Sequence, residues 1–181
     1  AYEACKQSSM VEEREIGLYQ QYGYVPYDLD KSDENWSVSK TLEYAYDDWC
    51  IAQFAKSLGK EQDAAYFAKR AENWCNLFDE KTTFFRPKDS KGQFIKPFNP
   101  KEYSKYFCES NAWHYRWFVP HNILGLRAAM GGMDAFEQKL DSMFTLAVTP
   151  DEKLPIFSTG MIGQYVHGNE PSHHVSYLYH F

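Results

Sequence analysis

Apolar residues recur at helical spacing along most of the chain, and this pattern predicts a mainly helical protein. The strongest example starts at Ser37 or Ser39, a residue type that caps helix N-termini, and stops before Gly59. A second amphipathic helix follows at once and ends near Asp79. Because the connection is short, we expect the two helices to pack as an antiparallel hairpin.

The remaining helices are shorter, and long loops separate them. We expect helices over residues 1 to about 21, from near Ser110 to Pro120, over 123–130 and over 134–144, with the chain ending inside another. Residues 81–102 predict a long loop with a small hairpin, and residues 149–160 predict a second loop. Helix pairs that alternate with long loops are what a toroid of helical hairpins requires. We therefore expect an all-α fold, with residues 1–181 forming part of one domain.

Composition narrows the classes of function. The 181 residues are 44% hydrophobic and 24% charged, which is ordinary for a globular domain. A net charge of −6 argues against a nucleic acid partner, which would need clustered Lys and Arg. The chain contains no run of about 18 apolar residues, so we expect no membrane span. Aromatic residues reach 18%, and core filling accounts for most of them, although aromatic rings also line sugar-binding grooves.

The four cysteines carry little functional signal. Cys5, Cys50, Cys75 and Cys108 lack the spacing of a metal site and are too few for a disulfide scaffold. We expect free, buried thiols, which leave the redox compartment open.

Oxygen and imidazole groups concentrate in residues 163–175, Gly-Gln-Tyr-Val-His-Gly-Asn-Glu-Pro-Ser-His-His-Val. Pro171 suits the first position of a helix, which places Asn169 and Glu170 at its N-terminal lip. An amide oxygen and a carboxylate are ligands that Ca²⁺ prefers, and Gly168 allows a sharp turn before them. The alternative is an N-cap flanked by exposed histidines.

Several carboxylates are candidates for acid–base chemistry. Glu109 is flanked by aromatic residues, an apolar setting that would keep a carboxyl group protonated near neutral pH. On the residues alone, a solvated position in the first turn of a helix explains Glu109 better. Glu43 and Asp47 share one helix face at i, i+4 spacing, which suits either a solvated face or the rim of a pocket.

Three long motifs resemble the calcium-dependent exo-α-mannosidases of glycoside hydrolase family 92. They are Ser-Val-Ser-Lys-Thr-Leu-Glu-Tyr-Ala-Tyr-Asp-Asp-Trp at 37–49, Glu-Ser-Asn-Ala-Trp-His-Tyr at 109–115 with Trp-Phe-Val-Pro-His at 117–121, and His-Gly-Asn-Glu-Pro-Ser-His-His at 167–174. The motifs occur in the family's order, and the resemblance covers nearly the whole chain. Around Glu109, this chain has Cys108, Ser110 and His114 where the family usually has Thr, Gly and Gln.

The resemblance implies a fold, a reaction and a set of site residues. It implies part of an (α/α)6 toroid from an inverting glycosidase that removes terminal α-linked mannose, α-1,2-linked in the first instance, from glycans such as N-glycans. Glu109 aligns with the general acid, and Asn169 and Glu170 align with residues that bind Ca²⁺. Gln164 is a weaker metal-ligand candidate. Substrate contacts are assigned to His167, His173, His174 and Trp113, although capping, packing or support of the calcium loop explains each of these residues as well.

Family members are several times longer than this chain, so the resemblance implies partners outside it. The water-activating carboxylate belongs to an Asp-rich motif that we expect beyond Phe181, and 181 residues alone would be inactive without the remaining domains of the parent enzyme. We expect the parent to be secreted or periplasmic.

Two rival interpretations stay open at this point. One is another toroidal carbohydrate enzyme, such as a different glycosidase or a polysaccharide lyase, which would not respond to a calcium chelator. The other is a helical-hairpin scaffold that binds partners and performs no chemistry.

Overall fold

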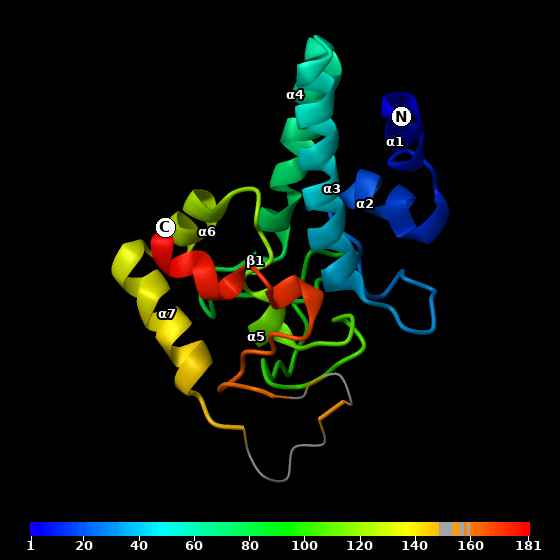
Figure 1. Ribbon diagram of the computed structural model, residues 1–181. Coiled ribbons are helices and arrows are strands. Elements are labelled where there is room, and N and C mark those ends of the chain that lie inside the picture. The colour runs from blue at the N-terminus through cyan, green and yellow to red at the C-terminus, as the bar shows by residue number, and fades with distance from the viewer. Residues whose placement is uncertain (149–153, 156–157, 159) are drawn as a thin grey trace. The chain divides into compact units, whose positions relative to one another are not determined.

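The computed structural model describes residues 1–148, 154–155, 158 and 160–181, and helices predominate among them (Figure 1). The chain divides into two compact units. The first comprises residues 1–78 and 86–98, and the second comprises residues 79–85 and 99–181. The assignment of residues 1–181 to one domain stays a prediction.

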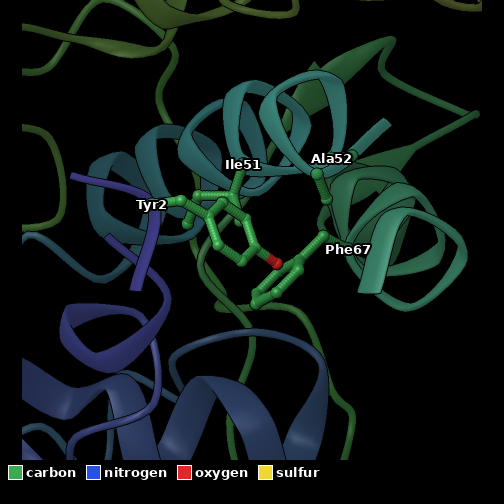
Figure 2. Packing of buried hydrophobic residues seen from close by; sticks show 5 residues of the cluster. Tyr2, Ile51, Ala52 and Phe67 are labelled. Atoms are coloured by element: carbon green, nitrogen blue, oxygen red, sulfur yellow. The ribbon is translucent and has the colours of Figure 1, made fainter. Parts of the chain in front are cut away.

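The first unit is organised around two helices that lie side by side, α3 and α4 (Figure 1). This arrangement confirms the predicted hairpin. Tyr2 and Phe67 pack their rings against Ile51 and Ala52 of α3 (Figure 2). The helices of this unit are α1 (Tyr2–Ser8), η1 (Glu13–Glu15), α2 (Ile16–Tyr22), α3 (Ser37–Ser57), α4 (Glu61–Arg70) and η2 (Ala71–Asn76), where η denotes a 3₁₀ helix.

The start of α3 differs from the predicted serine cap. Ser37 and Ser39 are buried inside the helix, and the cap position is held by Trp36 in a left-handed conformation. The buried side chain of Asn35 organises the turn, because its amide nitrogen donates to the carbonyl of Tyr27 and its oxygen accepts from the N–H of Ser37. An asparagine tolerates this conformation and offers local hydrogen bonds, so it replaces the serine cap.

The single helix predicted over residues 1–21 is wrong, because the chain breaks between α1 and α2. Ser9 closes α1 through its hydroxyl, which donates to the carbonyl of Lys6. Arg14 and Glu15 then adopt positive φ angles of 53° and 63°. Side chains of this kind rarely occupy left-handed backbone, and no periodic apolar signal marks such a reversal.

The second predicted helix changes type rather than continuing to Asp79. The α-helical hydrogen bonding ends at Arg70, and 3₁₀ geometry follows over η2. Ala71, Trp74 and Leu77 are all buried at three-residue spacing. Three residues per turn keep these side chains on one face, so the apolar pattern persists while the helix type changes.

The predicted small hairpin in the long loop is confirmed. The strands β1 (Phe78–Asp79) and β2 (Phe84–Phe85) form a two-stranded sheet, and an antiparallel bridge joins Lys88 to Phe94. Apart from β2, residues 81–102, all of which the structure describes, contain no strand or helix.

The second unit contains shorter helices, namely α5 (Ala112–Tyr115), α6 (Ile123–Ala129), α7 (Met133–Thr145), η3 (Glu170–Ser172) and η4 (Val175–His180). The helix expected from Ser110 to Pro120 shrinks to α5, while the two predicted after Pro120 are confirmed as α6 and α7. Trp117 packs edge-on against Phe136 of α7, with ring centroids 5.3 Å apart. The loop predicted at 149–160 lies largely outside the described residues.

Two further expectations concern membranes and thiols. In the described part of the chain, no helix combines the length and the apolar sequence needed to cross a bilayer. None of the four cysteines forms a disulfide, but Cys5, Cys50 and Cys75 are exposed, so the prediction of buried thiols is wrong for these three. Their helices bury the faces that carry larger apolar residues, which leaves the thiols outside.

Replacement of Phe67 by Ala should lower the free energy of unfolding by about 3–5 kcal/mol, because its fully buried ring leaves a cavity between α1, α3 and α4. Leu58→Ala is the matched control at a half-exposed site, with an expected loss below about 0.5 kcal/mol. Urea unfolding of both variants measures the difference, and equal losses would contradict this account of the core.

Candidate functional site

Residues 162–165 form a tight turn that anchors the motif-rich segment to α7. Ile162 and Tyr165 pair as an antiparallel bridge, and the N–H of Gln164 donates to the carbonyl of Met143 at 2.7 Å. Gly163 has a φ of 60°, and a Cβ atom there would overlap the main chain of Met143 and Phe144. Glycine is therefore required at this position, and it holds Gln164 against the end of α7.

Asn169 lies beside the loop of Glu109. It precedes η3, in which Glu170 is the first residue and Pro171, predicted at the first helical position, is the second. Its side-chain nitrogen donates to the main-chain carbonyl of Glu109 at 3.2 Å, and the side chain is 5% exposed. A carbonyl only accepts, so this contact assigns the amide orientation and leaves the amide oxygen of Asn169 free of that bond. The structure thus brings together two residues that are 60 positions apart in sequence.

Glu109 does not occupy the apolar setting that its aromatic neighbours in sequence suggest. Its side chain is exposed, and its φ of 52° is left-handed. The helix begins only after Asn111, whose side-chain oxygen accepts from the N–H groups of Trp113 and His114. The left-handed turn directs the carboxylate outward while Ser110 and Asn111 are buried, which is why burial of the neighbours does not extend to Glu109.

The candidate metal ligands are two amides and one carboxylate. Gln164 is 1% exposed, and its amide nitrogen has no hydrogen-bond partner among the described residues. Glu170 is exposed. Within the described ranges, no three His, Cys, Asp or Glu side chains converge as a metal site. A hard cation held by amide and carboxylate oxygens fits this donor set, and the observation that supports the fit is the amide oxygen of Asn169, which the bond to Glu109 does not use.

Two of the three histidines of the motif lie together. The exposed rings of His167 and His173 have centroids 5.3 Å apart, and the hydroxyl of Tyr165 lies 2.5 Å from Nδ1 of His167. Both imidazoles are therefore accessible to a ligand.

His174 is placed differently and supports the fold. Its Nε2 lies 2.8 Å from the main-chain carbonyl of Trp117, which requires a proton on that nitrogen. Burial lowers the pKa of His174, so the ring is neutral near pH 7. Its assignment to substrate binding stays a prediction from the resemblance.

Trp113 is buried and packs beside an unusual cation. Its ring meets Phe84 edge-on at 5.1 Å, and the Arg116 guanidinium lies 5.3 Å from it. Arg116 is fully buried, bonds Thr83 through Nη2, and has no carboxylate partner among the described residues. Burial lowers its pKa, yet a guanidinium stays charged at neutral pH, so the aromatic rings supply its main favourable contacts.

A pair that sequence reasoning missed is Ser110 and His114. Both side chains are buried, and Ser110 Oγ lies 2.6 Å from His114 Nδ1. The i, i+4 spacing next to Glu109 is the signal that could have identified the pair. Burial lowers the pKa of His114 to about 4, so the imidazole is neutral near pH 7.

The whole chain, residues 1–181, matches the glycosyl hydrolase family 92 catalytic domain. The chain belongs to glycosyl hydrolase family 92. This finding confirms the resemblance of the three motifs. It also confirms the helical (α/α)6-toroid fold class, which this family 92 chain shares with the solved mannosidases to which it is similar.

Three relatives illustrate the likeness. A family GH92 α-mannosidase from Bacteroides thetaiotaomicron is 44% identical, with a TM-score of 0.86 over 98% of this chain and 22% of that protein. A family GH92 inverting mannosidase from Bacteroides thetaiotaomicron VPI-5482 is 35% identical, with a TM-score of 0.82 over 99% of this chain and 26% of that protein. A protein from Arthroderma benhamiae described as an uncharacterized secreted glycosidase is 31% identical over all of this chain and 26% of its own length. This family 92 chain therefore spans about a quarter of the length of these relatives.

The neutral buried state of His114 predicts an acid-dependent loss of stability. Its folded pKa lies near 4, below the ordinary value of 6.5, so its contribution is present above pH 6.5 and is lost as the pH falls toward 4. His114→Gln should reduce this loss by up to about 3 kcal/mol. Urea unfolding at pH 4.5 and 7.5 measures the effect.

His180→Gln provides the matched control, because it makes the same substitution at an exposed histidine and removes no buried group. The difference between variants cancels the contributions of all other titrating groups. An acid dependence of His114→Gln equal to that of wild type would contradict a neutral buried imidazole.

Proposed function

We propose that the protein containing this chain is an exo-acting α-mannosidase that removes terminal α-linked mannose from glycans. The observation that carries the proposal is the family 92 match over all 181 residues, together with solved family 92 mannosidases at 35–44% identity. Preference for α-1,2 linkages in N-glycans belongs to the same proposal. The description of one relative as a secreted glycosidase supports a secreted parent.

Glu109 is proposed as the general acid. Its exposed carboxyl group is accessible to a substrate, and its main chain is held by Asn169. Glycoside hydrolysis requires a carboxylic acid that protonates the departing oxygen, and an inverting enzyme requires a second carboxylate that activates water. We propose that the second carboxylate comes from the parent protein outside these 181 residues.

Asn169, Glu170 and Gln164 are proposed to bind Ca²⁺. The bond to Glu109 does not use the amide oxygen of Asn169, and the exposed carboxylate of Glu170 follows it in sequence. A bound Ca²⁺ would supply a Lewis acid and a template for vicinal sugar hydroxyls, favouring a distorted ring. The chain's own contribution is to fix Asn169 against the Glu109 loop, so that a sugar held there lies beside the proposed acid.

His167 and His173 are proposed to contact the substrate. They are exposed and adjacent, and they flank the proposed Ca²⁺ ligands in sequence. The ring nitrogens of histidine form hydrogen bonds, which suits sugar hydroxyls. His174 and Trp113 are assigned weaker contributions because their rings are engaged in packing.

Replacement of Glu109 by Gln in the parent protein should lower turnover of natural mannosides by about two to four orders of magnitude, because the leaving oxygen loses its proton donor. Mannosides with an activated leaving group should lose much less. Steady-state kinetics on both substrate types provide the measurement, and equal losses would show that Glu109 is not the acid.

Variants of Asn169 separate cation binding from support of the acid. Asn169→Ala removes the oxygen ligand and the N–H donor together, so it should weaken Ca²⁺ binding and lower turnover. Asn169→Asp keeps an oxygen ligand but loses the bond to the Glu109 carbonyl, so Ca²⁺ binding should persist while turnover falls.

Calorimetry with Ca²⁺ and a chelator titration of activity provide the readouts. Unchanged Ca²⁺ affinity in Asn169→Ala and in Glu170→Gln would overturn the metal assignment. It would leave the mannosidase proposal to be decided by hydrolysis alone.

A further inference from the structure

The first unit contains a cavity that the proposed catalytic residues do not use. It has a volume of about 720 Å³ and lies among α1, η1, α2 and α3, with Arg70 at the end of α4. This volume falls within the range of small-molecule sites, about 300–1,000 Å³. None of the residues that line it belongs to the motifs around Glu109 or Asn169.

One wall of the cavity carries a fixed ion pair. Arg70 Nη2 lies 2.8 Å from Asp48 Oδ1, and Arg70 Nε donates to Asp48 Oδ2 at 2.9 Å. The hydroxyl of Tyr19 donates to the same carboxylate at 3.0 Å. The carboxylate is 1% exposed, its Oδ2 accepts two hydrogen bonds and its Oδ1 faces the guanidinium, so it is a fixed part of the wall rather than a free binding group.

Arg70 nevertheless retains binding capacity. Among the described residues, its Nη1 forms hydrogen bonds only to the thioether sulfur of Met10 at 3.1 Å and the hydroxyl of Tyr66 at 3.5 Å. A thioether is a weak acceptor, and 3.5 Å is a long hydrogen bond. One guanidinium nitrogen can therefore donate a stronger hydrogen bond to an oxygen atom of a ligand.

Three charged side chains line the cavity without internal partners. Glu13, Arg14 and Asp47 make no side-chain hydrogen bond or ion pair with any described residue. The main chain at Arg14 is left-handed, and its carbonyl accepts from the hydroxyl of Tyr44 at 2.7 Å. A non-glycine residue held in this strained conformation is more common at ligand sites than elsewhere.

The lining selects a class of ligand. An apolar molecule would desolvate Glu13, Arg14 and Asp47 without compensation, which is unfavourable. An anion would meet two unpaired carboxylates, and a cation would meet the unpaired Arg14. A neutral molecule with several hydroxyls can pair with groups of both charges. Its hydroxyls can donate hydrogen bonds to the carboxylates and accept them from the guanidinium groups.

The apolar lining suits the same ligand. Ile16, Ile51 and the ring of Tyr44 line the cavity beside the charged groups. The C–H faces of a pyranose ring pack on such surfaces while its hydroxyls reach polar groups.

We propose that this cavity is a sugar-binding site, in which Asp47 and Glu13 accept from hydroxyls and Arg14 and Arg70 donate to them. The choice of mannose as the sugar rests on the proposed mannosidase function. The site would then hold a further mannose unit of the glycan, away from hydrolysis.

Two exposed thiols allow a direct test in the parent protein. Cys5 and Cys50 line the cavity, whereas Cys75 is exposed and lies outside its lining. In a Glu109→Gln background, which spares the ligand from hydrolysis, methyl α-mannoside at ten times its dissociation constant should slow alkylation of Cys5 and Cys50 by about tenfold. Alkylation of Cys75 should stay unchanged, as read by peptide mass spectrometry.

Variants and calorimetry complete the experiment. Asp47→Asn should abolish the protection, whereas Asp33→Asn, at an exposed acid outside the lining, should preserve it. Calorimetry of the Glu109→Gln protein should give two mannose units bound, and one after Asp47→Asn. The calorimetric stoichiometry tests the proposed sugar site even if other parts of the parent protein shield the thiols from alkylation.

Unchanged alkylation of reactive Cys5 and Cys50 at saturating sugar, or a stoichiometry of one that Asp47→Asn does not alter, would overturn the proposal. Hydrolysis of an activated mannoside by the wild-type protein is a separate readout. Protection without hydrolysis supports the cavity and refutes the mannosidase, and hydrolysis without protection does the reverse.

Discussion

The buried ion pair between Asp48 and Arg70 is the constraint on which the first unit depends. It joins α3 to the end of α4, and the hydroxyl of Tyr19 in α2 donates to the same carboxylate. Burial raises the pKa of Asp48 to about 6, and Arg70 partly offsets this effect, so the carboxylate is ionised at neutral pH. Removal of one partner would leave a buried charge, at a cost of about 3–5 kcal/mol. The ion pair and its hydrogen bond from Tyr19 therefore connect α2, α3 and α4 beside the apolar core.

The second unit depends on a different kind of interaction, namely hydrogen bonds to main-chain atoms. Its helices are short, and the segments that carry the proposed site are turns and 3₁₀ helices. Gly163 allows close approach to α7, Asn111 caps α5, and Asn169 ties η3 to the Glu109 loop. Hydrogen bonds to main-chain atoms position the functional groups, because short helices supply little packing of their own. A site built this way is sensitive to single amide side chains.

Two buried polar side chains that lack an oppositely charged partner among the described residues, Arg116 and His114, follow the proposed acid in sequence. Arg116 is enclosed by aromatic rings, and His114 is held neutral by burial. Each would be costly in an ordinary core, since polar groups need partners when water is removed. Both lie on or beside α5, directly after Glu109. The loop of the proposed acid is thus supported by a layer of aromatic and desolvated polar groups rather than by an apolar core.

Sequence periodicity was sufficient to predict the longest helices. The α3–α4 hairpin, α6 and α7 follow from apolar spacing and glycine stops, because a long helix that buries one face needs that repeat. The three motifs at 37–49, 109–121 and 167–174 were also sufficient to identify the family, and the last of them placed Pro171 in the first turn of a helix. Long runs of specific residue types carry this information locally.

Tertiary structure decided the features that depend on distant or left-handed residues. The break at Arg14 and Glu15, the start of α3 at Trp36 and the outward turn at Glu109 all use positive φ angles, which leave no periodic signal in a sequence. The contact of Asn169 with Glu109 and the cavity beside Asp47 join residues that are far apart along the chain. Sequence alone determined which residue types are present for chemistry. Only the folded chain decided which of them are exposed and which are neighbours, because those properties arise from non-local packing.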